Sequence, residues 1–247
     1  MSRDIKLTGI TLIKNGNQLK YPYKACIQSL ASYCDQVIVN VGKSIDNTEH
    51  DVLQLVDKEF KNVAVYSTSW SEENTGNGQE LAIQANKLLP FVNTEWIVYL
   101  QADEFILEED IEKIKKDINS FNPNEEEYTQ IELFRTYFYK SLNTRLLKNE
   151  IWLGRIFKKG THTVGGDGMF LNRNSGRVWR AQDTKIMHYS RIGTEQEITN
   201  RVRQLDKLFH DEDEIKTFPA FKFETEGLIK YTGKHPKEML KFYNQIG

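Results

Sequence analysis

The 247-residue sequence has no apolar run that approaches the roughly 20 residues of a membrane-spanning helix. Its first residues, Met-Ser-Arg-Asp-Ile-Lys, lead directly into a predicted strand without the apolar core of a signal peptide. We therefore expect a cytoplasmic protein with no transmembrane segment. Peripheral association with the inner face of the membrane is compatible with this expectation.

Cysteine is scarce, and an excess of charge of one sign is absent. The only cysteines, Cys26 and Cys34, fall across a predicted helix and its end, where buried free thiols are favoured over a disulfide or a metal site. The formal net charge is -2. This balance lacks the overall basic field of proteins that bind nucleic acid by bulk electrostatics, so no nucleic-acid partner is expected.

Repeats, low-complexity segments and recognisable linkers are also missing, and 39% hydrophobic and 28% charged residues are ordinary values for a globular protein. We therefore expect a single domain over residues 1–247. Apolar, β-branched segments alternate with segments of helical spacing along the first hundred residues. The predicted strands are residues 7–14, 36–41, 63–67 and 96–101, and the predicted helices are residues 21–33, 51–60 and 79–89.

This alternation predicts an α/β fold with a mostly parallel central sheet, flanked by helices and joined by right-handed crossovers. The pattern changes after residue 104. Further strands are predicted at residues 129–139, 152–157 and 185–189, and further helices at 111–118, 194–209 and 237–246.

The segment 96–105, Trp-Ile-Val-Tyr-Leu-Gln-Ala-Asp-Glu-Phe, joins a buried strand to two acids. Open α/β sheets bind ligands outside the carboxyl ends of their strands, which places Asp103 and Glu104 beside such a ligand. Carboxylates there suit a divalent cation and, through it, a phosphate. The alternative is that both acids only begin the following helix, whose positive N-terminus favours acidic residues.

A glycine-rich segment occupies residues 158–178, with glycines at 160, 165, 166 and 168 around a single Asp167. It predicts a loop that lies close to a ligand. An ordinary tight turn is the alternative. Trp152 and Trp179 are candidates for stacking on a sugar ring, although large aromatic residues are more often part of the core.

Taken together, these segments resemble the family 2 glycosyltransferases of the GT-A fold, and more closely a bacterial family-2-like branch. The resemblance spans nearly the whole chain, and its specificity comes from the order of the motifs. The similar segments are residues 10–16, 36–48, 99–104, 166–170, 188–191, 207–212 and 231–239, together with the helix around Gly78 and Asn86.

The resemblance implies a GT-A domain with a nucleotide-binding half (about 1–106) and an acceptor half with C-terminal helices (107–247). It implies a nucleoside diphosphate sugar as donor, and a glycan or lipid-linked saccharide as acceptor. A divalent metal, Mn²⁺ or Mg²⁺, would be held by Asp103 and His188. The residues implied to bind the donor are Ile13, Lys14, Asn40, Gly42, Asp46, Gln79, Gln101 and Arg191.

Inverting sugar transfer also needs a general base near the acceptor hydroxyl. Asp167 is the first candidate, because it lies in the acceptor half. Glu104 is the second, and the alternative for Glu104 is a hydrogen bond that braces the loop after the central strand. His188 has a structural role as its alternative. The segment His210-Asp211-Glu212-Asp213 is not expected to be a metal cluster, because consecutive residues at a helix end point in different directions.

Two positions depart from the family pattern. The second strand ends in Asn40-Val41-Gly42, without the carboxylate that usually accepts a hydrogen bond from the nucleobase, and Gln101 stands where the first acid of the metal-binding triplet often lies. Two other functions stay open, and these two departures favour the second of them. One is a sugar nucleotidyltransferase, and the other is a degenerate GT-A domain that binds glycans or acts as a scaffold without catalysis.

Overall fold

The computed structural model describes residues 3–71, 78–121, 127–210, 214 and 226–246. Its longest strands lie in the second half of the chain. The strands are β1 (Leu7–Ile13), β2 (Gln36–Gly42), β3 (Val63–Thr68), β4 (Trp96–Tyr99), β5 (Glu104–Ile106), β6 (Tyr128–Leu146), β7 (Trp152–Lys158), β8 (His162–Gly165), β9 (Phe170–Arg173), β10 (Arg177–Ile192) and β11 (Leu228–Lys230).

The α-helices follow the alternation that the sequence predicted. They are α1 (Tyr23–Tyr33), α2 (Thr48–Glu59), α3 (Gln79–Asn86), α4 (Glu108–Ser120), α5 (Glu195–Asp206) and α7 (Lys237–Ile246), with short 3₁₀ turns η1 (Leu89–Phe91) and η2 (Leu147–Asn149). Within the described part of the chain, no helix combines the length and the apolar character needed to cross a membrane.

One large sheet holds most of the strands, in the order β3-β2-β1-β4-β7-β6-β10-β5, with β11 beside β6. β3, β2, β1 and β4 are mutually parallel, and β6 and β10 run in the same direction, while β7, β5 and β11 run against them. The predicted α/β class with a mostly parallel sheet is confirmed. All seven residues of β1 are buried, as expected of a strand covered on both faces.

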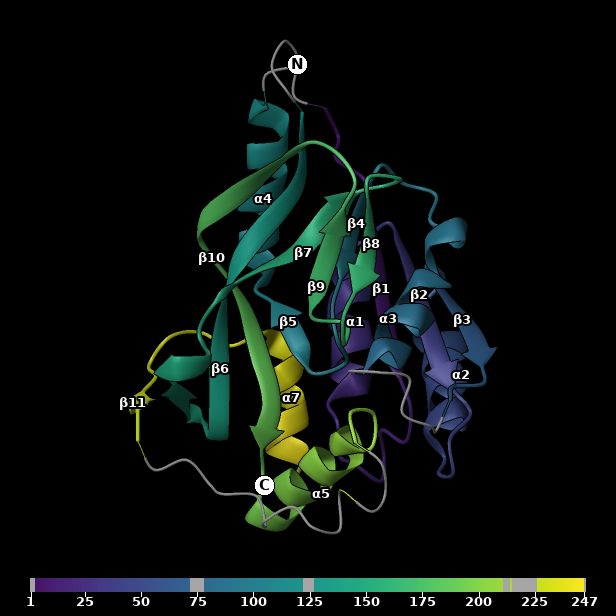
Figure 1. Ribbon diagram of the computed structural model, residues 1–247, viewed down its shortest axis with the longest axis vertical. Helices are drawn as coiled ribbons and strands as arrows, with labels where there is room; N and C mark the ends of the chain where they lie inside the picture. The colour runs from purple at the N-terminus through teal and green to yellow at the C-terminus, as the bar shows by residue number, and fades with distance from the viewer. Residues whose placement is uncertain (1–2, 72–77, 122–126, 211–213, 215–225, 247) are drawn as a thin grey trace.

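The two faces of this sheet carry different layers. α1, α2, α4 and α7 contribute to the larger apolar core on one face, and α3 packs with the β8–β9 hairpin on the other. α5 lies at the end of the molecule toward which β2 and β10 point (Figure 1). The carboxyl ends of the parallel strands therefore face α5. The strand order reverses between β1 and β4, and open α/β sheets bind ligands beside the carboxyl ends of the strands at such a reversal.

The strands of the second half are longer than the sequence predicted. β10 covers Arg177–Ile192 where residues 185–189 were predicted, and β6 covers Tyr128–Leu146 where 129–139 were predicted. Half of β10 carries exposed or half-buried polar residues and contains a register shift between Arg180 and Lys185, so it has no apolar run to recognise. β5 and β11 have three residues each and were not predicted, and the segment 158–178 that was predicted as a loop contains the paired strands β8 and β9. Residues 211–213 of the His210–Asp213 segment lie outside the described residues.

The packing of α1 on β1 yields a first testable prediction. Leu30 is fully buried, and a Cβ atom on Gly9 would lie 3.0 Å from its Cδ2. Leu30→Ala should lower the free energy of unfolding by about 2–5 kcal/mol, because it removes buried methyl groups and leaves a cavity. Leu53→Ala, at a position 48% exposed, is the matched control and should change it by less than about 0.5 kcal/mol. Urea unfolding followed by circular dichroism measures both. Equal losses would contradict the packing described.

Candidate functional site

The site is built where β4 ends. Leu100 N donates to Ile10 O at 3.1 Å, which holds the end of β4 against β1. A tight turn follows, in which Glu104 N donates to Gln101 O at 2.9 Å. This turn directs Asp103, only 6% exposed, toward β10, where Tyr189 N donates to the Asp103 carbonyl at 2.9 Å.

Asp103 and His188 lie side by side in this arrangement. His188 Nε2 is 3.4 Å from Asp103 Oδ1, and the Tyr137 ring stands edge-on to the imidazole at a centroid distance of 4.9 Å. His188 is buried, yet neither ring nitrogen has a hydrogen-bond partner among the described residues. Because buried polar atoms are normally paired, an imidazole whose two nitrogens lack hydrogen bonds to the described residues and whose Nε2 faces only a carboxylate makes this place a candidate ligand site.

This pair fits the divalent cation that the resemblance implies. A neutral imidazole nitrogen and a carboxylate oxygen are both metal ligands, and Mn²⁺ accepts such a mixed set. The described residues contain no group of three or more His, Cys, Asp or Glu able to hold a metal. Asp103 and His188 could therefore supply two protein ligands, and phosphate oxygens and water would supply the others.

Glu104 has a different environment from its neighbour. It is fully buried and makes a bidentate pair with Arg155 of β7, with Nε to Oε2 at 2.8 Å and Nη2 to Oε1 at 2.9 Å. Burial raises the pKa of Glu104, but the charge and hydrogen bonds of Arg155 outweigh it, so the pKa lies below the ordinary value. Oε2 also accepts from Gln101 N at 3.1 Å. This geometry favours the bracing role over the role of general base.

Asp167 lies in the turn between β8 and β9. The turn is tight, since Gly168 N donates to Gly165 O at 3.1 Å, and both Gly166 and Gly168 have positive φ. A side chain on Gly168 would meet the hydroxyl of Tyr99 at 2.8 Å, so the turn touches the end of β4. Asp167 Oδ1 accepts from Met169 N at 3.1 Å, and Oδ2 has no partner among the described residues.

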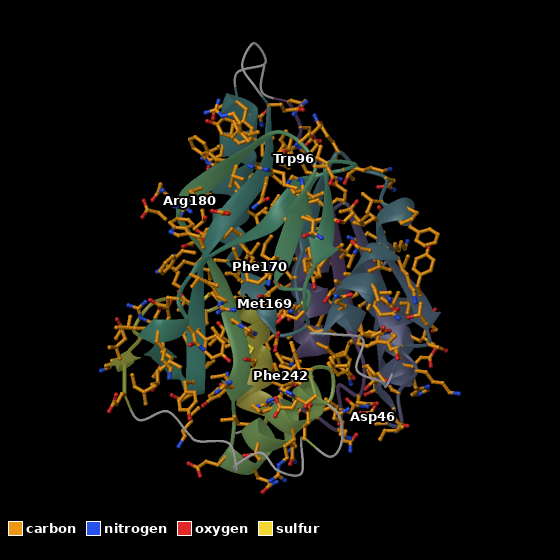
Figure 2. The ribbon with its side chains drawn as sticks, viewed as in Figure 1. Asp46, Trp96, Met169, Phe170, Arg180 and Phe242 are labelled. Carbon is orange, nitrogen blue, oxygen red and sulfur yellow. The ribbon has the colours of Figure 1, made fainter. Side chains whose placement is uncertain are left out.

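The same turn is anchored by Arg155. Its Nη1 donates to Met169 O at 2.7 Å, while the rest of its guanidinium holds Glu104. Met169 and Phe170 are labelled near the middle of the molecule in Figure 2. One buried arginine therefore fixes the loop that carries Asp103 and the turn that carries Asp167 relative to each other.

Basic residues approach the site from β10 and α5. Arg201 of α5 is 5% exposed and donates to the carbonyl oxygens of Leu19 (3.1 Å), Lys20 and Ile192. Its Nε has no partner among the described residues, and burial lowers its pKa while the nearby Tyr21 and Asp103 oppose that shift. Arg191, predicted to bind the donor, lies with its guanidinium 6.0 Å from the Tyr137 ring centroid.

Asn40, predicted to face the nucleobase, lies inside a hydrogen-bond network. Its Nδ2 donates to Gln84 O at 2.9 Å, and its Oδ1 accepts from Thr68 Oγ1 at 2.6 Å. The residue is fully buried. Its amide thus connects β2, β3 and α3, and we do not propose a direct contact between Asn40 and a base.

The remaining residues predicted to bind the donor lie around the carboxyl end of the sheet, but they do not all meet at one place. Asp46 ties two loops together, since it accepts from Gln18 N at 2.7 Å and Thr48 N at 2.9 Å. Ile13 is buried in the core, and Lys14 follows it at the end of β1. Gln79 is exposed at the first position of α3, after Gly78 with positive φ. The residues grouped at the end of β4 are Gln101, Asp103, Glu104, Asp167 and His188.

Two residues of this region were not recognised as functional in the sequence. Arg155 is a charged residue inside the apolar segment 152–157, and that isolated charge is a signal for a buried ion pair. Trp70 lies between the end of β3 and α3, and it carried no signal apart from its size. Arg155 pairs with Glu104, and Trp70 lies beside Asn40; both contacts join residues far apart in the sequence, so only the folded chain shows them.

Two open hollows, of about 390 and 580 Å³, lie elsewhere. Both include Asp4, Lys6 and Asp35, which are found at the amino ends of the parallel strands. Trp96, at the start of β4, and Asp46, beyond the end of β2, mark these opposite ends in Figure 2. Tyr33 lines the first hollow and Trp96 the second, each with one buried atom that has no hydrogen-bond partner in the described part of the chain, whereas His188 has two such atoms and faces Asp103, so the carboxyl end is the candidate site.

Comparison with known proteins gives structural likeness only. No family model matches the chain, and no curated protein matches it. Among solved structures, the chain is similar to S. aureus TarS in complex with UDP, at 15% identity and a TM-score of 0.49, over 81% of this chain and 64% of that chain. It is also similar to the mannosyltransferase PcManGT from Pyrobaculum calidifontis in complex with GDP-Man and Mn²⁺, at 14% identity and a TM-score of 0.48, over 89% of this chain and 66% of that chain.

The inositol-1-phosphate CTP transferase from T. maritima is a further similar structure, at 10% identity and a TM-score of 0.39, over 84% of this chain and 98% of that chain. The TarS chains are longer than this one, which spans between 39% and 65% of their length.

The Glu104–Arg155 pair yields the second prediction. Glu104→Gln removes one charge and leaves a buried guanidinium uncompensated, which should lower the free energy of unfolding by about 3–5 kcal/mol. Glu150→Gln is the control, because its pair with Arg145 is partly exposed on the arginine side. A loss below about 1 kcal/mol for Glu104→Gln, measured by urea unfolding, would contradict the bracing role.

The pair should also be visible in the pH dependence of stability. The folded-state pKa of Glu104 is lowered, so its contribution is complete above the unfolded pKa of about 4.3 and is lost as the pH falls through the folded pKa. The difference in unfolding free energy between the wild type and Glu104→Gln should therefore be constant from about pH 5 to 7 and shrink at lower pH. A difference that stays constant down to pH 2 would contradict this ionisation.

Proposed function

We propose that this protein is a glycosyltransferase that uses a nucleoside diphosphate sugar and transfers the sugar with inversion to a glycan or lipid-linked saccharide. The observation that carries the proposal is the pair of Asp103 and His188. Two buried groups meet at the carboxyl end of the parallel strands, and the imidazole nitrogens have no hydrogen-bond partner among the described residues. A site of this kind suits an anionic ligand joined to the protein through a cation.

The residues of the site support distinct roles in such a reaction. The sugar donor would bind with its diphosphate beside Asp103 and His188, and a bound divalent cation would supply Lewis-acid stabilisation of the leaving diphosphate. Arg201 adds positive charge on the α5 side. Its other nitrogens hold three backbone carbonyls, so its position is fixed before a ligand arrives.

Asp167 is proposed as the general base. The acceptor oxygen forms a bond to the anomeric carbon, the bond from that carbon to the diphosphate oxygen breaks, and the diphosphate leaves with the bonding electrons. The acceptor hydroxyl proton passes to the Asp167 carboxylate. Inversion requires the base on the face opposite the leaving group, and Asp167 comes from the β8–β9 turn rather than from the turn after β4 that carries Asp103.

The role of Asp103 gives the third prediction. Asp103→Ala should weaken binding of uridine or guanosine diphosphate in the presence of Mn²⁺ by at least about tenfold, because a cation ligand is lost. Isothermal titration calorimetry measures the affinity. Asp4→Ala, which removes an exposed carboxylate at the other end of the sheet, is the matched control and should bind as the wild type does. Equal affinities for Asp103→Ala and the wild type would show that the metal role is wrong.

The role of Asp167 gives the fourth prediction. Asp167→Asn should keep nucleotide affinity and lose roughly 10²- to 10⁴-fold in the rate of sugar transfer, since only the base is removed. The assay follows release of free nucleotide from a panel of nucleotide sugars. Asp183→Asn is the matched control, because Asp183 is exposed and also adopts positive φ, which asparagine tolerates.

Other outcomes of this assay identify the alternatives. Near wild-type transfer by Asp167→Asn, with none by a folded Glu104→Gln, would reverse the roles given to these two acids. Nucleotide binding without transfer of any sugar would favour a non-catalytic binding domain. Formation of a nucleotide sugar from a nucleoside triphosphate and a sugar phosphate would favour a nucleotidyltransferase.

A further inference from the structure

The indole of Trp70 covers the end of β2. A Cβ atom at position 42 would lie 2.7–2.8 Å from three adjacent ring atoms of Trp70, namely Cε2, Cδ2 and Nε1. Three neighbouring ring atoms at nearly equal distance show that the ring presents its face to the backbone of Gly42. Gly42 is not one of the glycines with positive φ, so its backbone conformation does not by itself require glycine. Glycine is needed there because the aromatic ring approaches the backbone closely.

Hydrogen bonds fix the ring in this place. Trp70 Nε1 donates to Thr68 Oγ1 at 3.0 Å and lies 3.4 Å from its second acceptor, Asn40 Oδ1. Asn40 is itself held by Gln84 of α3, at 2.9 Å from Nδ2 to the carbonyl oxygen. The next residue is fixed as well, because Ser71 N donates to Glu80 Oε1 at 2.9 Å. The indole is thus oriented before any ligand binds.

The position of this ring relative to Asp103 matches the length of a nucleotide. Neighbouring strands lie about 4.8 Å apart, and β2 is separated from β4 only by β1. The distance across the sheet between their ends is therefore on the order of 10 Å. A ribose and a base extend about this far from a phosphate at the end of β4. Trp70 is partly exposed, so its ring is not fully enclosed by the core.

We propose that Trp70 is the platform on which the nucleobase of the donor stacks. The inference rests on the proposed function, because it takes a nucleoside diphosphate as the ligand. It also accounts for the missing carboxylate at the end of β2. Asn40 is occupied in orienting the indole, and stacking supplies affinity for a base through its π-face without a hydrogen bond that selects one base.

The test compares ligands with and without a base. Trp70→Ala should weaken binding of uridine diphosphate and guanosine diphosphate in Mn²⁺ by roughly 10- to 100-fold, because base–aromatic stacking is lost. Binding of inorganic pyrophosphate should not change, since it lacks a base. Trp70→Phe, which keeps an aromatic face, should lose less affinity than Trp70→Ala. Phe91→Ala is the matched control: Phe91 is 46% exposed, and its carbonyl oxygen accepts from Gln36 at the start of β2, whereas Trp70 covers the end of β2.

Intrinsic fluorescence gives an independent measurement, because the chain has four tryptophans. Nucleoside diphosphates should quench the emission of the wild type, and Trp70→Phe should abolish this quenching while nucleotide still binds by calorimetry. Pyrophosphate should quench neither protein.

The outcomes separate this inference from the proposed function. Uridine and guanosine diphosphate that bind Trp70→Ala as tightly as the wild type would overturn the stacking role and leave the proposed function standing. Tighter binding to Trp70→Ala would overturn it too, since the indole would then occupy the place of the base. An equal loss for pyrophosphate would show that the variant disturbs the phosphate site instead. Absence of any nucleotide binding to the wild type would refute the proposed function itself.

Discussion

The buried ion pair between Glu104 and Arg155 is the constraint on which the rest of the site depends. Both side chains are completely removed from solvent, so each charge is tolerable only because the other is present. Arg155 uses its remaining nitrogen to hold the Met169 carbonyl of the β8–β9 turn. The loop after β4 and the turn that carries Asp167 come from segments more than fifty residues apart, and this one guanidinium makes them a single rigid unit. Geometry in the site is thus set by a residue that would not itself touch a substrate.

The parallel half of the fold could be predicted from the sequence because each of its strands is a local signal. β1 and β4 are buried on both faces. β1 is a mostly apolar segment, β4 is an unbroken apolar run, and the position of Asp103 follows from its place shortly after that run. β10 could not be predicted in the same way. Most residues of its exposed half are polar, and the register shift between Arg180 and Lys185 interrupts any regular spacing of apolar residues. The pairing of β6 with β10 depends on tertiary contact, so the local pattern of apolar and polar residues does not predict it.

The candidate site was predictable only as far as residue type allows. Asp103 and His188 were expected together, and the structure places them 3.4 Å apart. Asn40 and Glu104 belong to equally polar residue types, yet both have all their polar groups engaged within the protein. The difference lies in hydrogen-bond satisfaction, a property of the folded surroundings. The type of a polar residue gives the number of hydrogen bonds that it can make. Whether these are already made within the protein depends on its neighbours in the folded structure.

The guanidinium of Arg201 has a consequence for the order in which the chain folds. Its bond to the carbonyl of Leu19 joins residues 182 positions apart, whereas β1, β2 and β3 pair with near neighbours in the sequence. Closing so long a loop has an entropic cost that must be met before the contact gives any stabilisation. The parallel half is therefore expected to collapse first, and α5 to dock late. A folding intermediate would then have its central strands formed while the end that carries the candidate site is still incomplete.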